Sequence, residues 1–144
     1  MNEVEIELLT PGKVEIYWPM IERDLLNIPE VWNKWWTIDA LREGAFYGRF
    51  QVWTSGCETV TGVLFSQFCT YPAGVILQIV LAFGKDLDEV LPKFMAVLHR
   101  YASITGCSRV EIHGRLGWAR KLHQYGFVRE AVILTSNVPP GGLQ

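Results

Sequence analysis

One stretch near the C-terminus, residues 110–127, constrains the fold more than any other part of the chain. It reads VEIHGRLGWARKLHQYGF. Its first four residues alternate like a short strand, and Glu111 and His113 share the face opposite two apolar residues. Two glycines then permit a tight turn, the next apolar residues follow one helical face, and Gly126 suits the left-handed end of a helix. The stretch therefore predicts a strand, a short helix and the start of another strand.

Periodic apolar residues predict the other elements. Residues 87–105 form the clearest helix, because their apolar side chains recur at helical spacing throughout. Residues 75–83 are almost wholly apolar, which is typical of a strand buried on both faces. With a strand at 109–113 they predict a right-handed crossover between parallel strands. We also expect strands at 3–9, 47–53, 59–71 and 127–136, a helix at 14–27 after a break at Pro11-Gly12, and a helix at 38–43 that Thr37 caps and Gly44 closes.

This order of elements predicts one α+β domain with a mixed central sheet, one long helix and several short ones. The chain has 144 residues, which is enough for one domain rather than two. We expect this domain to cover residues 1–137. Residues 138–144 are rich in Pro and Gly and should form a flexible tail.

Composition excludes several classes of protein. The net charge of −2 leaves no excess of basic residues for binding nucleic acid. The longest apolar run, residues 75–83, is too short to cross a bilayer as a helix, and the first residues do not resemble a secretion signal. Three cysteines without a C-x-x-C pair favour a reduced, intracellular protein with no metal site. We therefore expect no nucleic-acid, membrane or metal partner.

The order of elements, with a long helix after the fourth strand and Gly-Phe before the last, is similar to the GNAT superfamily of N-acetyltransferases. This resemblance implies acetyl-CoA as cofactor, with its pyrophosphate held by a glycine-rich loop before the long helix. The matching loop here contains Gly84 and Lys85 but no Gly-x-Gly. Asp86, Asp88 and Glu89 follow, and each would repel a pyrophosphate by about 1 kcal/mol even at the dielectric constant of water. The loop thus favours a capped helix without a phosphate site.

The short helix also departs from the family pattern. The resemblance aligns Arg115, Trp118 and Leu122 with positions where the family has Asn, Ala and Tyr, while Gly126 and Phe127 match. The family's Tyr is the usual general acid for the departing thiolate, and leucine has no proton to donate. The family's packing residues are therefore present in this sequence, whereas the residues that bind the cofactor and protonate the leaving thiolate are replaced.

The same stretch also resembles small GNAT-like proteins encoded among the head and tail genes of tailed bacteriophages. The favoured interpretation is a structural or assembly component that has lost acetyl transfer, needs no cofactor, and resides in the host cytoplasm and the virion. Its partners would be other virion proteins or a second copy of itself. The candidate contact residues are Trp32, Trp35, Trp36, Arg115, Arg120 and Lys121. The three tryptophans have a second interpretation, as a cap over the core.

The alternative is an acetyl-CoA-dependent N-acetyltransferase with an atypical loop. In it Gly84 and Lys85 would lie near the phosphates, and Glu111, His113 or Tyr125 would act as acid or base. Glu111 has a second interpretation, a salt bridge with Arg109 or Arg115.

Overall fold

The computed structural model describes residues 5–28, 36–56, 60–114 and 116–141. These residues form five strands, four α-helices and one 3-10 turn. The strands are β1 (Ile6–Leu8), β2 (Gln51–Ser55), β3 (Gly62–Tyr71), β4 (Gly74–Phe83) and β5 (Arg109–Ile112), and the helices are α1 (Pro11–Leu26), α2 (Ile38–Phe46), α3 (Leu87–Ile104) and α4 (Leu116–Leu122), followed by η1 (His123–Tyr125).

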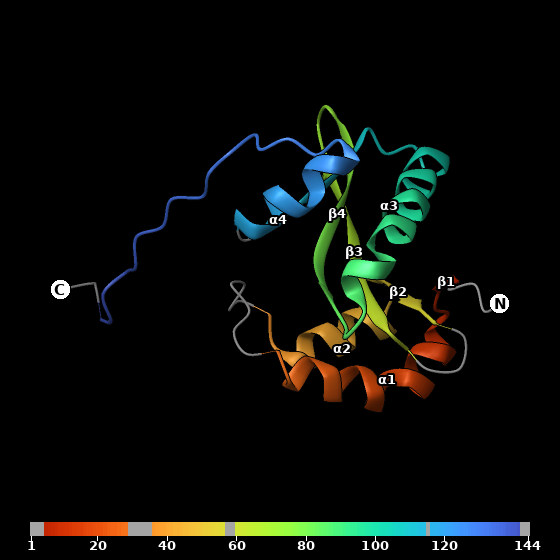
Figure 1. Cartoon of the computed structure of the whole chain (residues 1–144). Coiled ribbons are helices and arrows are strands. Elements are labelled where there is room, and N and C mark those ends of the chain that lie inside the picture. Colours follow the sequence, from red (N-terminus) through yellow and green to blue (C-terminus); the bar gives the residue numbers. More distant parts are fainter. Residues whose placement is uncertain (1–4, 29–35, 57–59, 115, 142–144) are drawn as a thin grey trace.

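The strands form one mixed sheet in the order β1-β2-β3-β4-β5 (Figure 1). The first four pair antiparallel, and β4 and β5 pair parallel. Helix α3 connects these two parallel strands, so the predicted crossover between parallel strands is confirmed. The predicted α+β class with a mixed sheet is confirmed as well.

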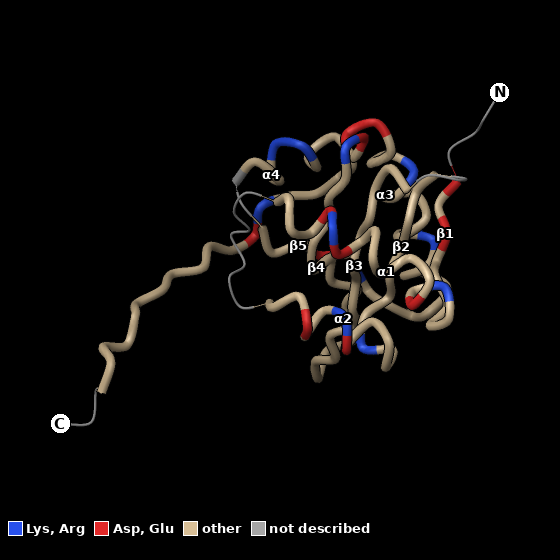
Figure 2. Tube along the Cα trace, turned by 90° about the horizontal axis from the view of Figure 1, so that it is seen from below, with Lys and Arg blue, Asp and Glu red and all other residues tan. Residues whose placement is uncertain are grey.

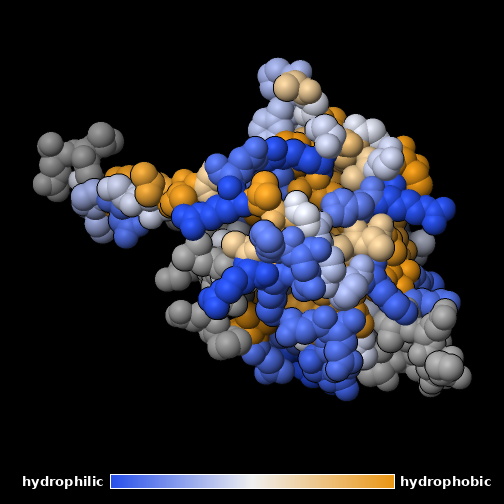
Figure 3. All heavy atoms as spheres, turned by 45° about the horizontal axis from the view of Figure 1, so that its top comes forward, coloured by the Kyte–Doolittle hydropathy of each residue, from blue (hydrophilic) through white to orange (hydrophobic). Residues whose placement is uncertain are grey.

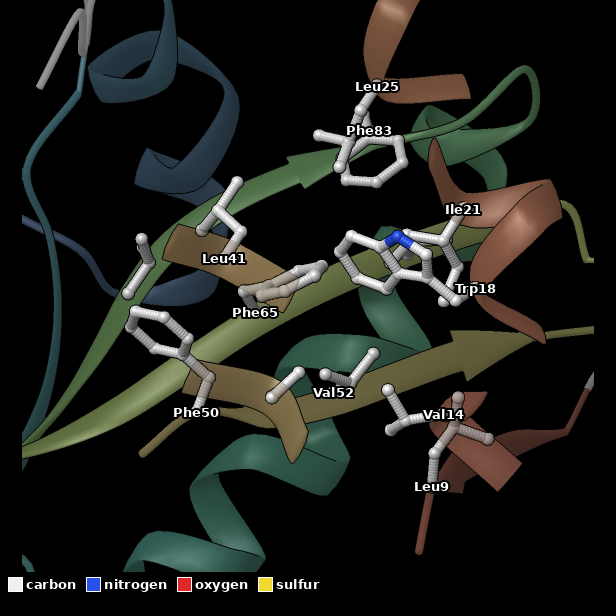
Figure 4. Close-up of a cluster of buried hydrophobic side chains, with 13 residues drawn as sticks. Leu9, Val14, Trp18, Ile21, Leu25, Leu41, Phe50, Val52, Phe65 and Phe83 are labelled. Carbon is white, nitrogen blue, oxygen red and sulfur yellow. The ribbon is translucent and has the colours of Figure 1, made fainter. Parts of the chain in front are cut away.

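The core has two apolar layers, one on each face of the sheet. On one face α1 and α2 cover strand residues that include Val52, Phe65 and Phe83 (Figure 4). Trp18 of α1 meets the ring of Phe65 edge-on, with centroids 6.4 Å apart. On the other face α3 and Leu122 of α4 pack against a second set of strand residues. Both layers form because successive side chains along a strand point to opposite faces of the sheet.

Two predicted helix limits are wrong. The strand ends before Pro11-Gly12 as expected, but α1 begins at Pro11 and not at Val14. Proline suits a first helical turn, and Thr10 accepts a hydrogen bond from the Lys13 N–H. Gly44 does not end α2, which continues to Phe46. A Cβ at Gly44 would lie 2.4 Å from the Phe50 ring, so close packing accounts for this glycine. The predicted cap at Thr37 is confirmed by its hydrogen bond with the Ala40 N–H.

The predicted last strand, residues 127–136, is also wrong. Gly126 adopts the predicted left-handed conformation, but the residues after it form neither strand nor helix. Residues 127–133 still line a groove against the body of the molecule, and the chain beyond them runs away from it (blue in Figure 1). Alternation correctly indicated an extended chain, but a strand also needs a neighbour with which to exchange backbone hydrogen bonds.

Gly84, the one glycine of the loop before α3, should not tolerate a side chain. Its φ is +136°, and a Cβ there would lie 2.4 Å from the Thr61 carbonyl oxygen. We expect Gly84→Ala to lower the free energy of unfolding by about 2–5 kcal/mol, from backbone strain and overpacking together. The matched control is Gly12→Ala in α1, where a Cβ meets nothing within 4 Å; it should not destabilise. Urea denaturation measures both, and equal stability of the two variants would contradict the assignment.

Candidate functional site

The site lies where β4 and β5 part. Their pairing extends from Ile76–Arg109 to Ile79–Ile112, while β4 continues to Phe83 without a partner on that side among the described residues. At the same point β4 holds one extra residue against β3, since the register shifts between Phe65 and Ser66. Such a bulge disrupts the ladder locally and leaves backbone groups unpaired. His113 is the first residue of the chain beyond the paired part of β5.

A directed chain of hydrogen bonds leads across β3, β4 and β5 to His113. The Gln67 Nε2–H donates to Gln78 Oε1 over 2.6 Å, so the other side of the Gln78 amide is the donor. Gln78 Nε2 lies 3.2 Å from His113 Nδ1, and His113 Nε2 lies 3.3 Å from Glu111 Oε1. These contacts fit the tautomer in which Gln78 donates to Nδ1 and the Nε2–H donates to the Glu111 carboxylate.

Glu111 is held in place by Arg109. Arg109 Nε donates to the Glu111 carboxylate over 2.7 Å, and the same guanidinium also pairs with Glu130. The hydrogen bond to Glu130, followed by that to Glu111, raises the pKa of Arg109, and Arg109 lowers the pKa of Glu130. The expected salt bridge from Glu111 to Arg109 is thus present, and Glu111 also contacts His113. Arg115, the other expected partner, lies outside the described residues.

Cys69 borders the same row of side chains and does not have the character of a nucleophile. Its Sγ lies 3.8 Å from Gln78 Oε1. Burial, followed by the negative charge of Glu111, raises the pKa of the thiol, while Arg49 acts in the opposite direction. A thiol kept protonated is a poor nucleophile.

The start of α3 is occupied by the protein's own groups. The N–H groups of Asp86, Leu87, Glu89 and Val90 each donate to a backbone carbonyl. Lys121 of α4 donates to the Asp88 carboxylate over 2.7 Å and so joins the two helices. The acidic start of α3 (red) and the basic residues of α4 (blue) lie on the same side of the molecule (Figure 2). Only Lys85 adds a positive charge within the loop itself, so the loop offers little to a pyrophosphate.

Leu122 and Trp118 are packing residues in this structure. Leu122 is 1% exposed and belongs to the core layer beneath α3. Trp118 is half-buried against Gly114, where a Cβ would lie 2.6 Å from the indole ring. The half-buried Tyr125 packs against the same apolar layer, whereas the Gln78 row lies on the other face of the sheet. The structure therefore brings Glu111 and His113 into direct contact. Tyr125 lines the same groove as these two residues but packs against the apolar layer.

The expected partner-binding residues are only partly described. Trp32, Trp35 and Arg115 lie outside the described residues. Trp36 packs edge-on against Phe50 at 5.1 Å, beneath the guanidinium of Arg49. Arg120 is exposed on α4, and Lys121 is engaged with Asp88. A role of these residues in binding a partner remains a prediction.

Gln67 and Gln78 were not predicted as site residues. Each is a polar residue in a largely apolar strand, and this pattern could have marked them as candidates. Their contact with His113 depends on the register of three strands, which could not be predicted from the sequence alone. Among the residues that the structure describes, no three metal-ligating side chains gather, and no helix is both long and apolar enough to cross a membrane.

Comparison with known proteins identifies the fold. No protein-family model matches the sequence, and no curated protein matches it. An aminoglycoside acetyltransferase from an uncultured soil metagenomic sample superposes with a TM-score of 0.71 at 14% identity, covering 94% of this chain and 97% of that one. Glucosamine-6-phosphate N-acetyltransferase from Arabidopsis thaliana gives 0.66 at 12% identity, with 96% and 100% covered. A transcriptional regulator from Bacillus halodurans gives 0.68 at 17% identity, with 94% and 99% covered. At these identities the likeness shows a fold only, and that fold is GNAT.

Restoring the family's tyrosine should not restore a general acid, because position 122 faces the core. We expect Leu122→Tyr to lower the free energy of unfolding by about 1–3 kcal/mol through overpacking. The matched control is Gln124→Tyr, which places the same ring at an exposed position nearby and should change stability by less than about 0.5 kcal/mol. Thermal and urea unfolding measure both variants. A fully stable Leu122→Tyr variant would contradict the buried placement.

Proposed function

We propose that this protein is an N-acetyltransferase that transfers an acetyl group from acetyl-CoA to an amine. Two of the structures with this fold carry the names of acetyltransferases that act on amino sugars or aminoglycosides. The observation that carries the proposal is the chain from Gln67 through Gln78 to His113 and Glu111, which ends where β4 and β5 part. A role in a phage particle, which the sequence favoured, has no support from these comparisons and remains a prediction.

His113 is the general base in this proposal. An amine that becomes an amide must lose a proton, and a positioned imidazole can accept it. In the tautomer with the proton on Nε2, Nδ1 is the basic nitrogen, and it lies 3.2 Å from Gln78 Nε2. The His113 side chain is 47% exposed, so an acceptor can approach. The amine N–H would take the place of the Gln78 amide and pass its proton to Nδ1.

Glu111 is a positioning residue for this base. Its carboxylate accepts the Nε2–H, which fixes the tautomer, and it stabilises the imidazolium that forms when Nδ1 takes up a proton. Arg109 holds the carboxylate from the other side. Glu111 can therefore form the salt bridge with Arg109 and orient His113 at the same time.

The residues fit the two ends of acetyl-CoA differently. The unpaired edge of β4 beyond Ile79 offers backbone groups to an extended, amide-containing arm. The start of α3 does not fit a pyrophosphate, because four of its N–H groups already donate to backbone carbonyls and Lys121 is bound to Asp88. Acetyl-CoA would supply the activated acetyl group, and its phosphates would contribute little binding energy.

The first test measures thiol release from acetyl-CoA with sisomicin, glucosamine-6-phosphate and a lysine-containing peptide as acceptors. We expect turnover with at least one amine, and His113→Gln should lower kcat/KM by about 100-fold or more. Glu111→Gln should lower it less, because the amide still accepts the Nε2–H but carries no charge. The control is Glu130→Gln, which removes the other carboxylate on Arg109 and leaves His113 untouched. No thiol release with any amine, or equal losses in Glu111→Gln and Glu130→Gln, would refute the proposed roles.

The second test concerns the acidic start of α3. We expect the double variant Asp86→Asn/Asp88→Asn to bind acetyl-CoA about tenfold more tightly or better, since two repulsive charges are removed and Lys121 is released. Isothermal titration calorimetry measures the affinity. The matched control, Asp39→Asn in the first turn of α2, should bind as the wild type does. Unchanged or weaker binding by the double variant would mean that the cofactor does not approach α3.

A further inference from the structure

The sheet ends at a strand with a free edge. β5 has four residues and pairs only with β4 among the residues that the structure describes. The outer backbone groups of such a strand are a template for a further strand. Residues 127–136, which were expected to form a strand, form none in the structure and do not pair with β5.

The segment that follows η1, residues 127–141, is here called the arm. Beyond Phe127 it is exposed and contains five apolar side chains in water (Val128, Val132, Ile133, Leu134 and Val138). Leu134 and Val138 are 90% and 83% exposed. Figure 3 shows orange, hydrophobic residues along the arm where it leaves the body. An extended apolar segment of this kind is a candidate for burial against another surface.

A groove of about 1000 Å³ lies between the free edge of β5 and the first half of the arm. Its walls are β5 continued by His113 and Gly114, the last turns of α3, α4 with η1, and the first residues of the arm up to Ile133. The arm is attached there at two points, by Glu130 to Arg109 and by the ring of Phe127 to His99. The groove is therefore bordered on two sides by extended chain with unpaired backbone.

The arm is poorly suited to fold back into its own groove. Residues 129–133 already line the outer wall, so a return would need a tight turn near Ile133 and Leu134. The sequence there, VILTS, contains no glycine, asparagine or proline and includes β-branched residues. Tight hairpin turns require residues that tolerate a positive φ, and these do not. The distal half of the arm instead continues away from its own body (Figure 1).

We propose that residues 134–138 of the arm insert as a strand beside β5 of a second copy of this chain, and that the exchange is reciprocal. Pro139 and Pro140 have no N–H and end the strand just after Val138. The five remaining residues match the four of β5 in length. Leu134 and Val138 are four residues apart and therefore share one face of the strand, which covers the apolar side of the groove. A reciprocal exchange closes as a two-fold dimer.

The test is the mass of the full chain in solution, by light scattering after size exclusion over a dilution series. We expect twice the chain mass of 16.4 kDa. The variant Leu134→Asp/Val138→Asp should raise the dissociation constant of the dimer by at least about 100-fold without changing the fold, because both side chains are exposed within one copy. The control Ile16→Asp/Leu26→Asp changes two similarly exposed residues of α1 and should remain a dimer.

A wild-type monomer at every concentration, or a dimer that survives the two arm substitutions, overturns the proposal. Hydrogen exchange then locates the interface. The amides of residues 134–138 should be protected in the dimer and lose protection on dilution. A dimer in which these amides exchange as in an open chain also overturns it. Since the readouts are mass and exchange, the result is independent of acetyl transfer.

Discussion

The short parallel pairing between β4 and β5 is the constraint on which the candidate site depends. It lasts for four residue pairs and ends at Ile79 and Ile112, next to the bulge in β4. Alternation along β5 places Glu111 and His113 on one face, and the register with β4 places Gln78 opposite Glu111. The catalytic proposal therefore rests on a backbone register, because a shift of one residue would send both side chains to the other face.

The negative charges at the start of α3 oppose the binding of a cofactor's phosphates to the N-terminus of this helix. Helix N-termini attract anions, but here Asp88 and Glu89 lie in the first turn and Lys121 is neutralised by Asp88. The acids stabilise the helix itself. In the proposed enzyme, hydrogen bonds between side chains would order the residues that transfer the proton, whereas Asp88 and its contact with Lys121 would oppose a phosphate at the start of α3. An acetyl donor such as acetyl-CoA would be held mainly through its extended, amide-containing chain and not through its phosphates.

Much of the fold could be predicted from the sequence, and the exceptions have physical causes. Local signals were sufficient at Thr37 and Gly126, whose capping and backbone roles depend on adjacent residues. They failed at Gly44, because a glycine is needed there to make room for the Phe50 ring, which tertiary packing brings against α2. They failed again for the arm, since alternation indicates an extended chain and not which strand it meets. In the site, strand periodicity placed Glu111 and His113 on one face, but the contribution of Gln67 required the register of three strands.

In the proposed reaction, His113 presents a basic Nδ1 where β4 and β5 part. The most direct measurement is nitrogen-15 NMR of the imidazole rings at neutral pH, with His113→Gln used to assign the resonances. The account predicts a single neutral tautomer for His113, with the proton on Nε2 and a hydrogen bond to Glu111. A His113 ring protonated on Nδ1, or one that averages between both tautomers, would contradict it, because the basic nitrogen would then not face the incoming amine.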